Sequence, residues 1–347
     1  MTIRKLNPLT LGLIAGFAWP NLAHAELQID AYGSARIQAE SVNPDQNVSF
    51  GSGEQGSYVG VRDAYSRLGF NANWQLAQDF NWFGQLEIPF DIANWKVQDP
   101  YADFRDIRVS KVGLETPVGT LSYGQMWLPY YNAISYKVDR FSTYYSGYAT
   151  YATFRLNNTV SYYSPDIKGW SFALAAIGTS DENALEGRSE ETFQATLSYA
   201  FGATDLSFGL DDQRGNDNSR LLGFALGHQL DRLYFGAKYE VFQSDKATGY
   251  GSDGSNVVNV YADYDLRPIV VKVMVAEVEY FGDQILHLGM DYQMNKTTKL
   301  FAEYYQQESQ AAISNRQAGG SDNGITNFAD PLNGGGNVLA FGVRYDF

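Results

Sequence analysis

The chain has 347 residues, no cysteine and a formal net charge of −14. The lack of cysteine excludes a scaffold held together by disulfides, and the acidic charge argues against a nucleic-acid partner. The mean hydropathy is −0.30, and no apolar run reaches the length of about 18 residues that a membrane-spanning helix needs.

The first 25 residues have the composition of a secretory signal peptide. Arg4 and Lys5 precede an apolar run over residues 11–19, and Ala23 and Ala25 supply small residues at a cleavage site. That run is too short to cross a bilayer. We expect residues 1–25 to be removed during export, leaving residues 26–347 as a single domain. Loss of Arg4 and Lys5 lowers the 25 basic residues to 23, against 39 acidic residues.

Segments in which apolar and polar residues alternate recur along the rest of the chain. Side chains of a strand alternate between two faces, so each segment predicts a strand with one apolar and one polar face. The last of them alternates without interruption up to Phe347. In chain order the sixteen segments are residues 27–36, 67–74, 81–91, 108–114, 120–125, 155–162, 170–176, 193–199, 206–210, 222–226, 233–241, 258–264, 269–275, 286–292, 299–305 and 338–347.

The connections between these segments alternate between short turns and long polar loops. The expected short turns include residues 75–79, 115–119, 164–169, 200–204, 230–231, 265–267 and 293–297. The expected long loops include residues 41–60, 125–153, 178–191, 211–218, 243–255 and 306–337. This alternation is typical of outer-membrane barrels, and unpaired strand edges are not tolerated in hydrocarbon. We therefore predict an all-β fold, a closed transmembrane antiparallel barrel of about sixteen strands. A β-sandwich, as in a secreted soluble adhesin, is the competing interpretation.

Motifs for catalysis or for cofactor binding have little support. Residues 51–56 match a dinucleotide-binding fingerprint, but a strand rather than a helix is expected to follow them, so we interpret them as a loop. After export the only histidines are His228 and His287, in separate segments. The acidic residues at 181, 182, 186, 190 and 191 form either a divalent-cation site or a solvated loop. We expect no cofactor, no metal and no enzymatic activity.

Four arginines fall on the polar faces of four segments. These are Arg36, Arg67, Arg108 and Arg155, called the arginine row below. A charge on a lipid-facing side costs about 2–4 kcal/mol at the bilayer midplane, so we expect the arginine row to face an aqueous lumen. A row of charge along a narrow pore filters solutes by their charge. Ordinary lumen-lining charge without selectivity is the simpler alternative.

The mature chain resembles the general porin family of Gram-negative bacteria. The resemblance is carried by the sequences at residues 65–70 (YSRLGF), 108–114 (RVSKVGL), 119–124 (GTLSYG) and 155–158 (RLNN), and by the terminal Phe347. It implies a sixteen-stranded homotrimeric diffusion channel in the outer membrane. It further implies that Arg67, Arg108 and Arg155 form a basic wall at the constriction, that the third loop folds into the lumen, and that the barrel-assembly machinery recognises Phe347 as an assembly signal.

The third loop departs from the pattern of that family. The family faces its arginines with several loop acids, whereas residues 125–153 contain one acid, Asp139, between Lys137 and Arg140. The loop is instead rich in aromatic rings, including Tyr136, Tyr144 and Tyr145. These rings either stack on sugars, which would make the channel selective for an oligosaccharide, or pack the loop against the wall.

The expected partners follow from these interpretations. They are two further copies of the chain, outer-membrane lipid with lipopolysaccharide, the barrel-assembly machinery, and small hydrophilic solutes that diffuse through the channel. A barrel enzyme such as a lipase or protease is a further alternative. The small outward residues Ala31, Gly33 and Ala35 on the first segment suit contact with protein as well as with lipid.

Overall fold

The computed structural model describes residues 27–45, 48–50, 53–99, 107–147, 149–185, 188–215, 217–280, 282–308 and 335–347. The expected signal peptide lies outside these residues. The strands of the large sheet are β1 (Leu27–Pro44), β4 (Tyr58–Asp63), β5 (Arg67–Ala77), β6 (Phe80–Pro89), β7 (Val109–Thr116), β8 (Gly119–Trp127), β9 (Arg155–Tyr163), β10 (Trp170–Ile177), β11 (Thr192–Phe201), β12 (Thr204–Arg214), β13 (Ser219–Leu230), β14 (Leu233–Gln243), β15 (Asn256–Asp265), β16 (Ile269–Val278), β17 (Gly282–Gln293), β18 (Thr298–Gln307) and β19 (Gly336–Asp346).

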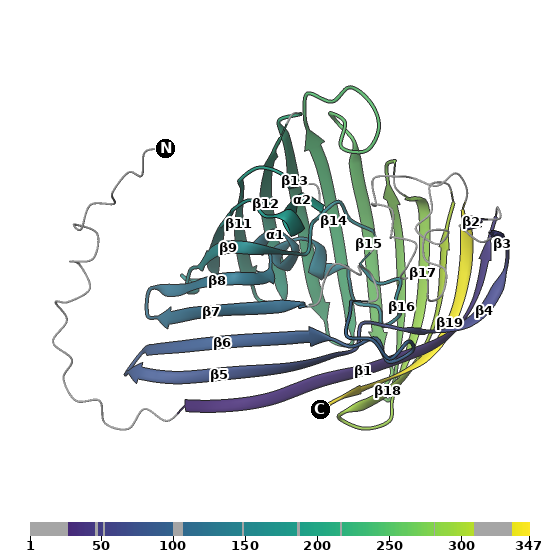
Figure 1. The fold of residues 1–347 in the computed structure, drawn as a ribbon, viewed down its shortest axis with the longest axis horizontal. Helices are drawn as coiled ribbons and strands as arrows, with labels where there is room; N and C mark the ends of the chain where they lie inside the picture. The colour runs from purple at the N-terminus through teal and green to yellow at the C-terminus, as the bar shows by residue number, and fades with distance from the viewer. Residues whose placement is uncertain are drawn as a thin grey trace, which may run out of the picture.

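The sheet closes on itself through its first strand. One edge of β1 pairs with β19, and the other pairs first with β5 and then with β4. Because β4 and β5 follow one another along the same edge of β1, they act as one bent strand. The 17 strands of the sheet therefore form a closed barrel of sixteen, with antiparallel pairing between neighbours (Figure 1). The predicted barrel and its strand number are confirmed.

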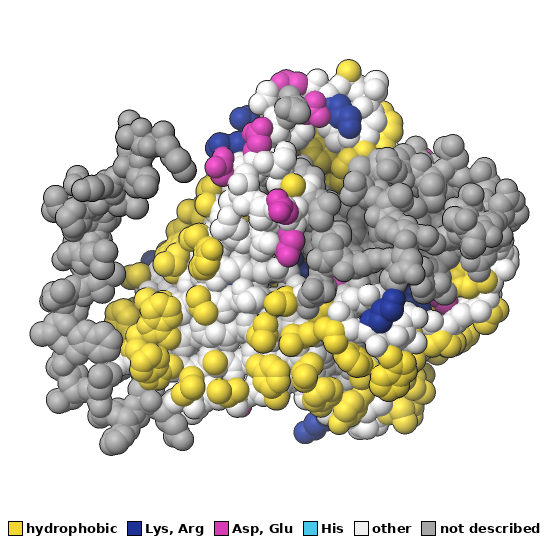
Figure 2. Space-filling model, viewed as in Figure 1, with side chains coloured by type: hydrophobic (Ala, Val, Ile, Leu, Met, Phe, Trp, Pro, Cys, Tyr) yellow, Lys and Arg dark blue, Asp and Glu magenta, His cyan; other side chains and the backbone are white. Residues whose placement is uncertain are grey.

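The two faces of each strand have the predicted characters. On β16, Val271, Val273 and Val275 point outward and are 40–51% exposed, whereas the alternate residues Lys272 and Met274 are buried inside. Figure 2 shows apolar side chains gathered in a band around the visible outer wall, with most of the visible charged side chains above it. Aromatic rings pair near the short turns, as Trp170 does by stacking on Tyr199 at 4.4 Å. An apolar band with aromatic rings at its edge is the surface that a bilayer requires.

The connections differ from the predicted alternation in three places. Residues 41–60, expected as a long loop, include the end of β1, a small hairpin and the start of β4. Residues 211–214 of the expected loop 211–218 are strand, because the ladder of β12 and β13 continues and only residues 215–218 connect the two strands. Gly215 and Asn218 take positive φ angles of 75° and 47°, which lets the chain reverse in so few residues. The connection between β16 and β17 is equally short.

The glycine-rich motif at residues 51–56 belongs to a small separate hairpin. Strands β2 (Val48–Phe50) and β3 (Gly53–Gln55) pair with each other, and β4 follows them. The described residues after the motif therefore begin a strand, and without a helix N-terminus the motif forms no phosphate cradle.

The helical elements are few and short. They are α1 (Pro129–Ala133), the 3₁₀ helix η2 (Ser135–Lys137) and α2 (Asp181–Leu185). Within the described residues, none of the helices has the length and apolarity needed to cross a membrane.

Candidate pore constriction

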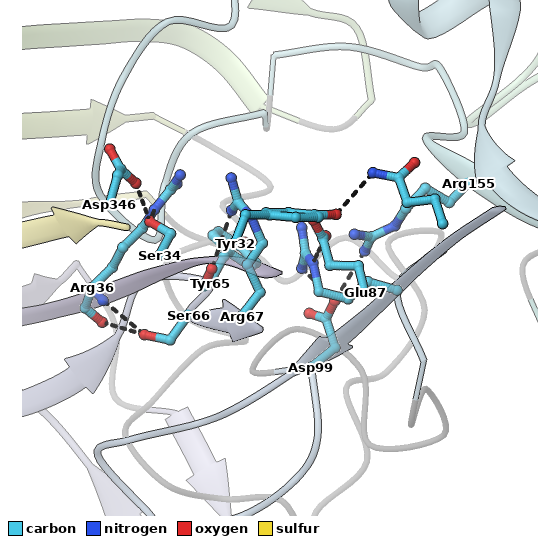
Figure 3. Close-up of polar contacts among 12 residues, drawn as sticks. Tyr32, Ser34, Arg36, Tyr65, Ser66, Arg67, Glu87, Asp99, Arg155 and Asp346 are labelled. Atoms are coloured by element: carbon cyan, nitrogen blue, oxygen red, sulfur yellow. Dashed lines mark hydrogen bonds and ion pairs between the residues drawn. The ribbon is translucent and has the colours of Figure 1, made fainter. Parts of the chain in front are cut away.

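The arginine row lies on the inner face of one side of the barrel, on β1 and its neighbour β5 and then at the starts of the alternate strands β7 and β9. Arg36 is on β1, Arg67 begins β5 and Arg155 begins β9 (Figure 3), and Arg108 directly precedes β7. The side chains of Arg108 and Arg155 are only 4% exposed, while that of Arg67 is 22% exposed. Arg36 is also buried, at 9% exposure, so Arg67 is the most exposed member of the row.

Two carboxylates contact the arginine row. Asp99, from the connection between β6 and β7, accepts from Arg108 Nη1 at 2.8 Å and from Arg155 Nη2 at 2.9 Å. Glu87 on β6 lies 2.9 Å from Arg108 Nε and 3.4 Å from Arg67 Nε. Buried charges need such partners because the loss of hydration is large. Arg108 and Arg155 are therefore held as structural ion pairs.

The surroundings of Arg36 are different. Arg36 donates from Nε to Ser34 Oγ at 2.7 Å, and Ser34 in turn donates to Asp346 at 2.6 Å. Arg344, opposite Arg36 in the β1–β19 register, donates from Nε to both oxygens of Asp346. None of the ion pairs among the described residues includes Arg36.

The third loop, residues 128–154 between β8 and β9, is fastened to the inner wall by buried acceptors. Glu303 accepts from the backbone N–H groups of Ser142 at 2.7 Å and Thr143 at 3.2 Å. Glu240 accepts from the N–H of Tyr151 at 3.1 Å. These carboxylates lie on β18 and β14, so in this protein the wall supplies acids to the loop.

Four glycines on the inner face give the loop its space. They are Gly209 on β12, Gly223 on β13, Gly236 on β14 and Gly289 on β17, called the glycine track below. A Cβ on Gly223 would lie 2.3 Å from the Tyr130 hydroxyl, and one on Gly209 would lie 2.9 Å from Ile134. Any larger residue would push the loop away from the wall.

The charged residues of the third loop bind the wall and each other. Lys137 pairs with Asp205 at 2.7 Å, and Arg140 pairs with Asp263 at 3.3 Å. Asp139 accepts from the Tyr131 hydroxyl at 2.6 Å, and burial raises the pKa of Asp139. The described contacts of these charges are thus with the loop itself and the opposite wall.

Most described rings of the loop are packing groups. Tyr130, Tyr144 and Tyr145 are at most 1% exposed, whereas Tyr136 is 58% exposed. Tyr144 stacks on Tyr65 of the wall at 5.3 Å. Buried rings offer no face to a passing sugar, which favours packing over sugar stacking for these three tyrosines.

The loop and the wall that holds it pair acids with bases. The wall acids Asp205, Glu240, Asp263, Asp291 and Glu303 interact with Lys238, Lys272, Lys299 and His287 of the wall and with Lys137 and Arg140 of the loop. The opposite side carries the arginine row and Arg344 against Glu87, Asp99 and Asp346. Within this cluster five arginines meet three carboxylates, while the same side also carries the Arg62–Glu40 pair, Lys111 and Asp30 with Glu115 along the polar cavity, and the buried Asp63.

A polar cavity of about 550 Å³ adjoins the arginine row. Its lining includes Asp30, Asn71, Lys111, Ser122 and Trp127. These residues come from strands β1, β5, β7 and β8, and Asn132 of helix α1 in the third loop also lines the cavity. Solvated side chains of this kind are what a water-filled passage requires.

Other candidate groups contribute no assembled site. His228 contacts Thr204, and His287 pairs with Glu303 beneath Phe141. No three His, Asp or Glu residues of the described ranges are placed to hold a metal ion. Of the acidic residues at 181–191, Glu182 accepts from Asn157, and position 186 lies outside the described residues.

The terminal Phe347 completes the barrel seam. Its backbone exchanges hydrogen bonds with Gly33 at 2.9 and 3.1 Å. Its ring covers Gly33 so closely that a Cβ there would lie 2.2 Å from the ring. An aromatic ring over a cross-strand glycine is a recurrent way to shield such a position.

Sequence analysis missed several residues of the constriction. Ser34, Arg344 and Asp346 lie on the polar faces of predicted strands, so the alternation that revealed Arg36 could also have revealed them. Asp99 lies in an irregular connection, where no periodicity marks it.

Comparisons with known proteins place the chain in a family. A model of the family described as Gram-negative porin matches residues 10–312. Outer membrane porin F of Escherichia coli is 24% identical over 80% of this chain and 85% of its own length.

Two solved structures show the same fold at low identity. An anion-selective porin from Comamonas acidovorans has a TM-score of 0.66 and 17% identity, covering 93% of this chain and all of its own. The trimer form of OmpT from Vibrio cholerae has a TM-score of 0.60 and 14% identity, covering 92% of this chain and 99% of its own. Together with the closed barrel and its polar lumen, the family match shows that this chain belongs to the Gram-negative porin family and is an outer-membrane channel.

Proposed function

We propose that this porin is a passive diffusion channel for small hydrophilic solutes that admits anions more readily than cations. The observation that carries the proposal is the local concentration of arginine on one wall: the arginine row and Arg344 form a cluster in which five guanidinium groups share the three carboxylates Glu87, Asp99 and Asp346. The arginine row forms one wall of the narrowest section, and Lys137, Asp139, Arg140, Tyr136, Tyr144 and Tyr145 belong to the loop that forms the other.

The net charge of the chain does not decide this preference. Charges separated from a permeating ion by more than the Debye length, about 8–10 Å near physiological salt, are largely screened. Charges on the wall of a narrow, poorly polarisable passage act at close range and are screened less. The local excess of arginine therefore outweighs the larger excess of distant acids.

A reversal potential in a KCl gradient tests the preference. The purified porin in a planar bilayer should give a potential of the sign set by chloride. Arg67→Gln should shift it toward the potassium side, while Arg220→Gln, which removes a charge 57% exposed near the end of β13, should shift it little. A potassium-side potential in the unaltered protein would contradict the proposal.

The channel is proposed to work as a homotrimer. Support comes from an apolar groove of about 640 Å³ on the outer wall, lined in part by Ile37, Ala39, Ala302 and Phe341, next to the small residues of β1. A solved relative is described as a trimer form. Ala39→Trp should shift the native mass toward monomer, whereas Val273→Trp on the outer face of β16 should not. A monomeric unaltered protein would exclude this state.

The remaining assignments follow the same logic. The outer band contacts outer-membrane lipid and lipopolysaccharide, and the barrel-assembly machinery recognises Phe347. Residues 1–25 are removed, so the mature N-terminus is residue 26. N-terminal sequencing of the exported protein tests this assignment. The protein supplies a passage and performs no catalysis, so purified protein should hydrolyse neither lipid nor peptide substrates.

A further inference from the structure

A small cavity lies where the middle of the third loop meets the inner wall. Its volume is about 10 Å³, close to the space that one water molecule needs. The loop contributes Asp139 and Phe141 to its lining, and the wall contributes Asn259 on β15 and His287 on β17. Both wall residues are at most 1% exposed. The cavity therefore belongs to the interface that holds the loop, and it shares no lining residue with the polar cavity beside the arginine row.

Three buried polar atoms belong to residues of this lining. They are Oδ1 of Asp139, Oδ1 of Asn259 and Nδ1 of His287, called the buried trio below. Within the described residues, none of the three atoms has a hydrogen-bond partner. Buried polar atoms are almost always hydrogen-bonded, because the hydration that they lose is otherwise not replaced. Three such atoms around one cavity therefore indicate a partner that they share.

The other polar atoms of Asp139 and Asn259 are already engaged. Oδ2 of Asp139 accepts from the Tyr131 hydroxyl at 2.6 Å, and Nδ2 of Asn259 donates to the carbonyl oxygen of Ala149 at 3.0 Å. Tyr131 and Ala149 line the same cavity. Because the amide nitrogen of Asn259 faces a carbonyl, its remaining atom, Oδ1, can only accept a hydrogen bond.

The ring of His287 is also fixed. It stacks on Phe141 with the ring centroids 3.5 Å apart, and its Nε2 lies 3.0 Å from Glu303 Oε2. Glu303 accepts from the N–H groups of Ser142 and Thr143 as well, so it acts as an ionised acceptor and the ring proton lies on Nε2. Nδ1 of a neutral ring in this form is an acceptor. Glu303 does not line the cavity, so the cavity lies on the Nδ1 side of the ring.

We propose that one water molecule binds in this cavity and joins the third loop to the wall through the buried trio. Its two hydrogens match Asn259 Oδ1 and His287 Nδ1, which only accept. Its oxygen accepts from Asp139 when that carboxyl carries a proton, which gives the water the three hydrogen bonds typical of a buried site. Burial raises the pKa of Asp139 and so favours that form. The loop thus has an attachment to β15 and β17 that is separate from the bonds of Glu303 to Ser142 and Thr143.

Crystallography of the unaltered porin tests the occupant directly. A high-resolution map should show one peak within hydrogen-bond distance, about 2.6–3.2 Å, of all three atoms of the buried trio. Crystals grown in rubidium chloride distinguish a cation from water, because rubidium scatters anomalously and water does not. An anomalous peak in the cavity would replace the water by a cation and overturn the proposal. A cavity without any peak would overturn it as well.

Nitrogen NMR of histidine tests the same site in detergent solution. Beyond residue 25 the sequence has two histidines, His228 and His287, so a His228→Gln variant assigns both rings. His287 should show a protonated Nε2 and an unprotonated Nδ1 whose signal is shifted by an accepted hydrogen bond. A ring protonated on both nitrogens, or an Nδ1 signal without that shift, would contradict the water site.

Two variants separate the buried trio from general packing of the cavity. Asn259→Leu roughly keeps the size of the side chain and removes one acceptor, so the Nδ1 signal of His287 should move toward that of a nitrogen without a hydrogen bond. Met274→Leu is the matched control, because Met274 lines the same cavity and the exchange conserves volume while leaving the trio intact. Its Nδ1 signal should stay in place.

The outcomes for these variants are distinct from those of the diffusion function. A variant that carries KCl current is folded, so a change in its Nδ1 signal reports on the cavity. Equal Nδ1 signals in Asn259→Leu and the unaltered porin would count against the water. If Asn259→Leu does not fold, the crystal and NMR measurements on the unaltered porin still decide the question.

Discussion

The hydroxyl of Tyr130 occupies the space that a side chain at Gly223 would need: a Cβ there would lie 2.3 Å away from it. Helix α1 of the third loop can therefore pack against β13 only because residue 223 has no Cβ. Because Tyr130 is fully buried, it has no free volume into which to retreat.

Gly223→Val should displace the start of the third loop and lower the stability of the barrel. Overpacking of this kind costs about 1–3 kcal/mol of stability. The folded form should therefore be lost at a lower temperature when the protein is heated in detergent and analysed by gel electrophoresis. Single-channel conductance should change at the same time, because the loop moves into the passage. Gly84→Ala, where an added Cβ would meet its neighbours at 3.9 Å, is the matched control and should change neither quantity.

Glu303→Gln should loosen the middle of the third loop. The carboxylate accepts hydrogen bonds from the N–H groups of Ser142 and Thr143 and contacts His287. Loss of its charge should cost about 2 kcal/mol and increase fluctuations of the open-channel current. Glu277→Gln, on the outer face of β16, should leave the fluctuations of the open-channel current unchanged. If both variants behave alike, Glu303 does not anchor the loop.

Asp99→Asn should strengthen the preference for anions. Asp99 partly neutralises Arg108 and Arg155, so its loss leaves more positive charge on the wall. The reversal potential in a KCl gradient should move further toward chloride, and the folded state should lose stability because the arginines stay buried. Asp181→Asn, in the exposed helix α2, controls for a change of net charge alone. An unchanged potential in Asp99→Asn would rule out a role for this wall in selectivity.

Asp139 should make stability depend on pH in an unusual direction. Burial raises the pKa of Asp139, so the folded protein holds this proton more tightly than the unfolded chain. The contribution of Asp139 to the free energy of unfolding is fully present below the pKa of the unfolded chain, about 3.9. This contribution decreases as the pH rises from that value through the pKa of the folded protein. Asp139→Asn should flatten that part of the curve of thermal midpoint against pH. A curve of unchanged slope would contradict the assignment.

Phe347→Ala should impair closure of the barrel. The ring covers Gly33, and its removal exposes the seam where β1 meets the C-terminus. The yield of folded protein in the outer membrane should fall, through the lost seam contact and through loss of the proposed assembly signal. Leu339→Ala, another outward apolar residue on β19 that lies outside the proposed trimer groove, separates this effect from the loss of any apolar surface. Refolding of purified protein in detergent tests the seam contact without the assembly machinery.

The barrel could be predicted from the sequence because lipid and water impose one period on every strand. The alternation that places Val271 outside and Lys272 inside is visible in the letters alone, and so are Arg36 and Arg67 on the polar face. The length of the β12–β13 hairpin was predicted wrongly, because polar residues such as Asp211 continue a strand as readily as they form a loop.

The details of the constriction could not be predicted, because they depend on contacts between distant segments. Asp99 becomes the partner of Arg108 and Arg155 only when an irregular connection folds over the wall. The aromatic composition of the third loop favoured packing but left sugar stacking open, and the burial of Tyr144 and Tyr145 supports packing. The role of the glycine track could not be predicted, because it depends on the contact between these glycines and the third loop.

That glycine track has a consequence for engineering this protein. A third loop transplanted from another porin would arrive on a wall hollowed for the rings of Tyr130 and Phe141, and it would leave gaps there. Conversely, this loop would clash with a recipient barrel that carries ordinary side chains at the positions equivalent to 209, 223, 236 and 289. Loop and wall are therefore one exchangeable unit, and chimeras designed to alter permeability should move both together.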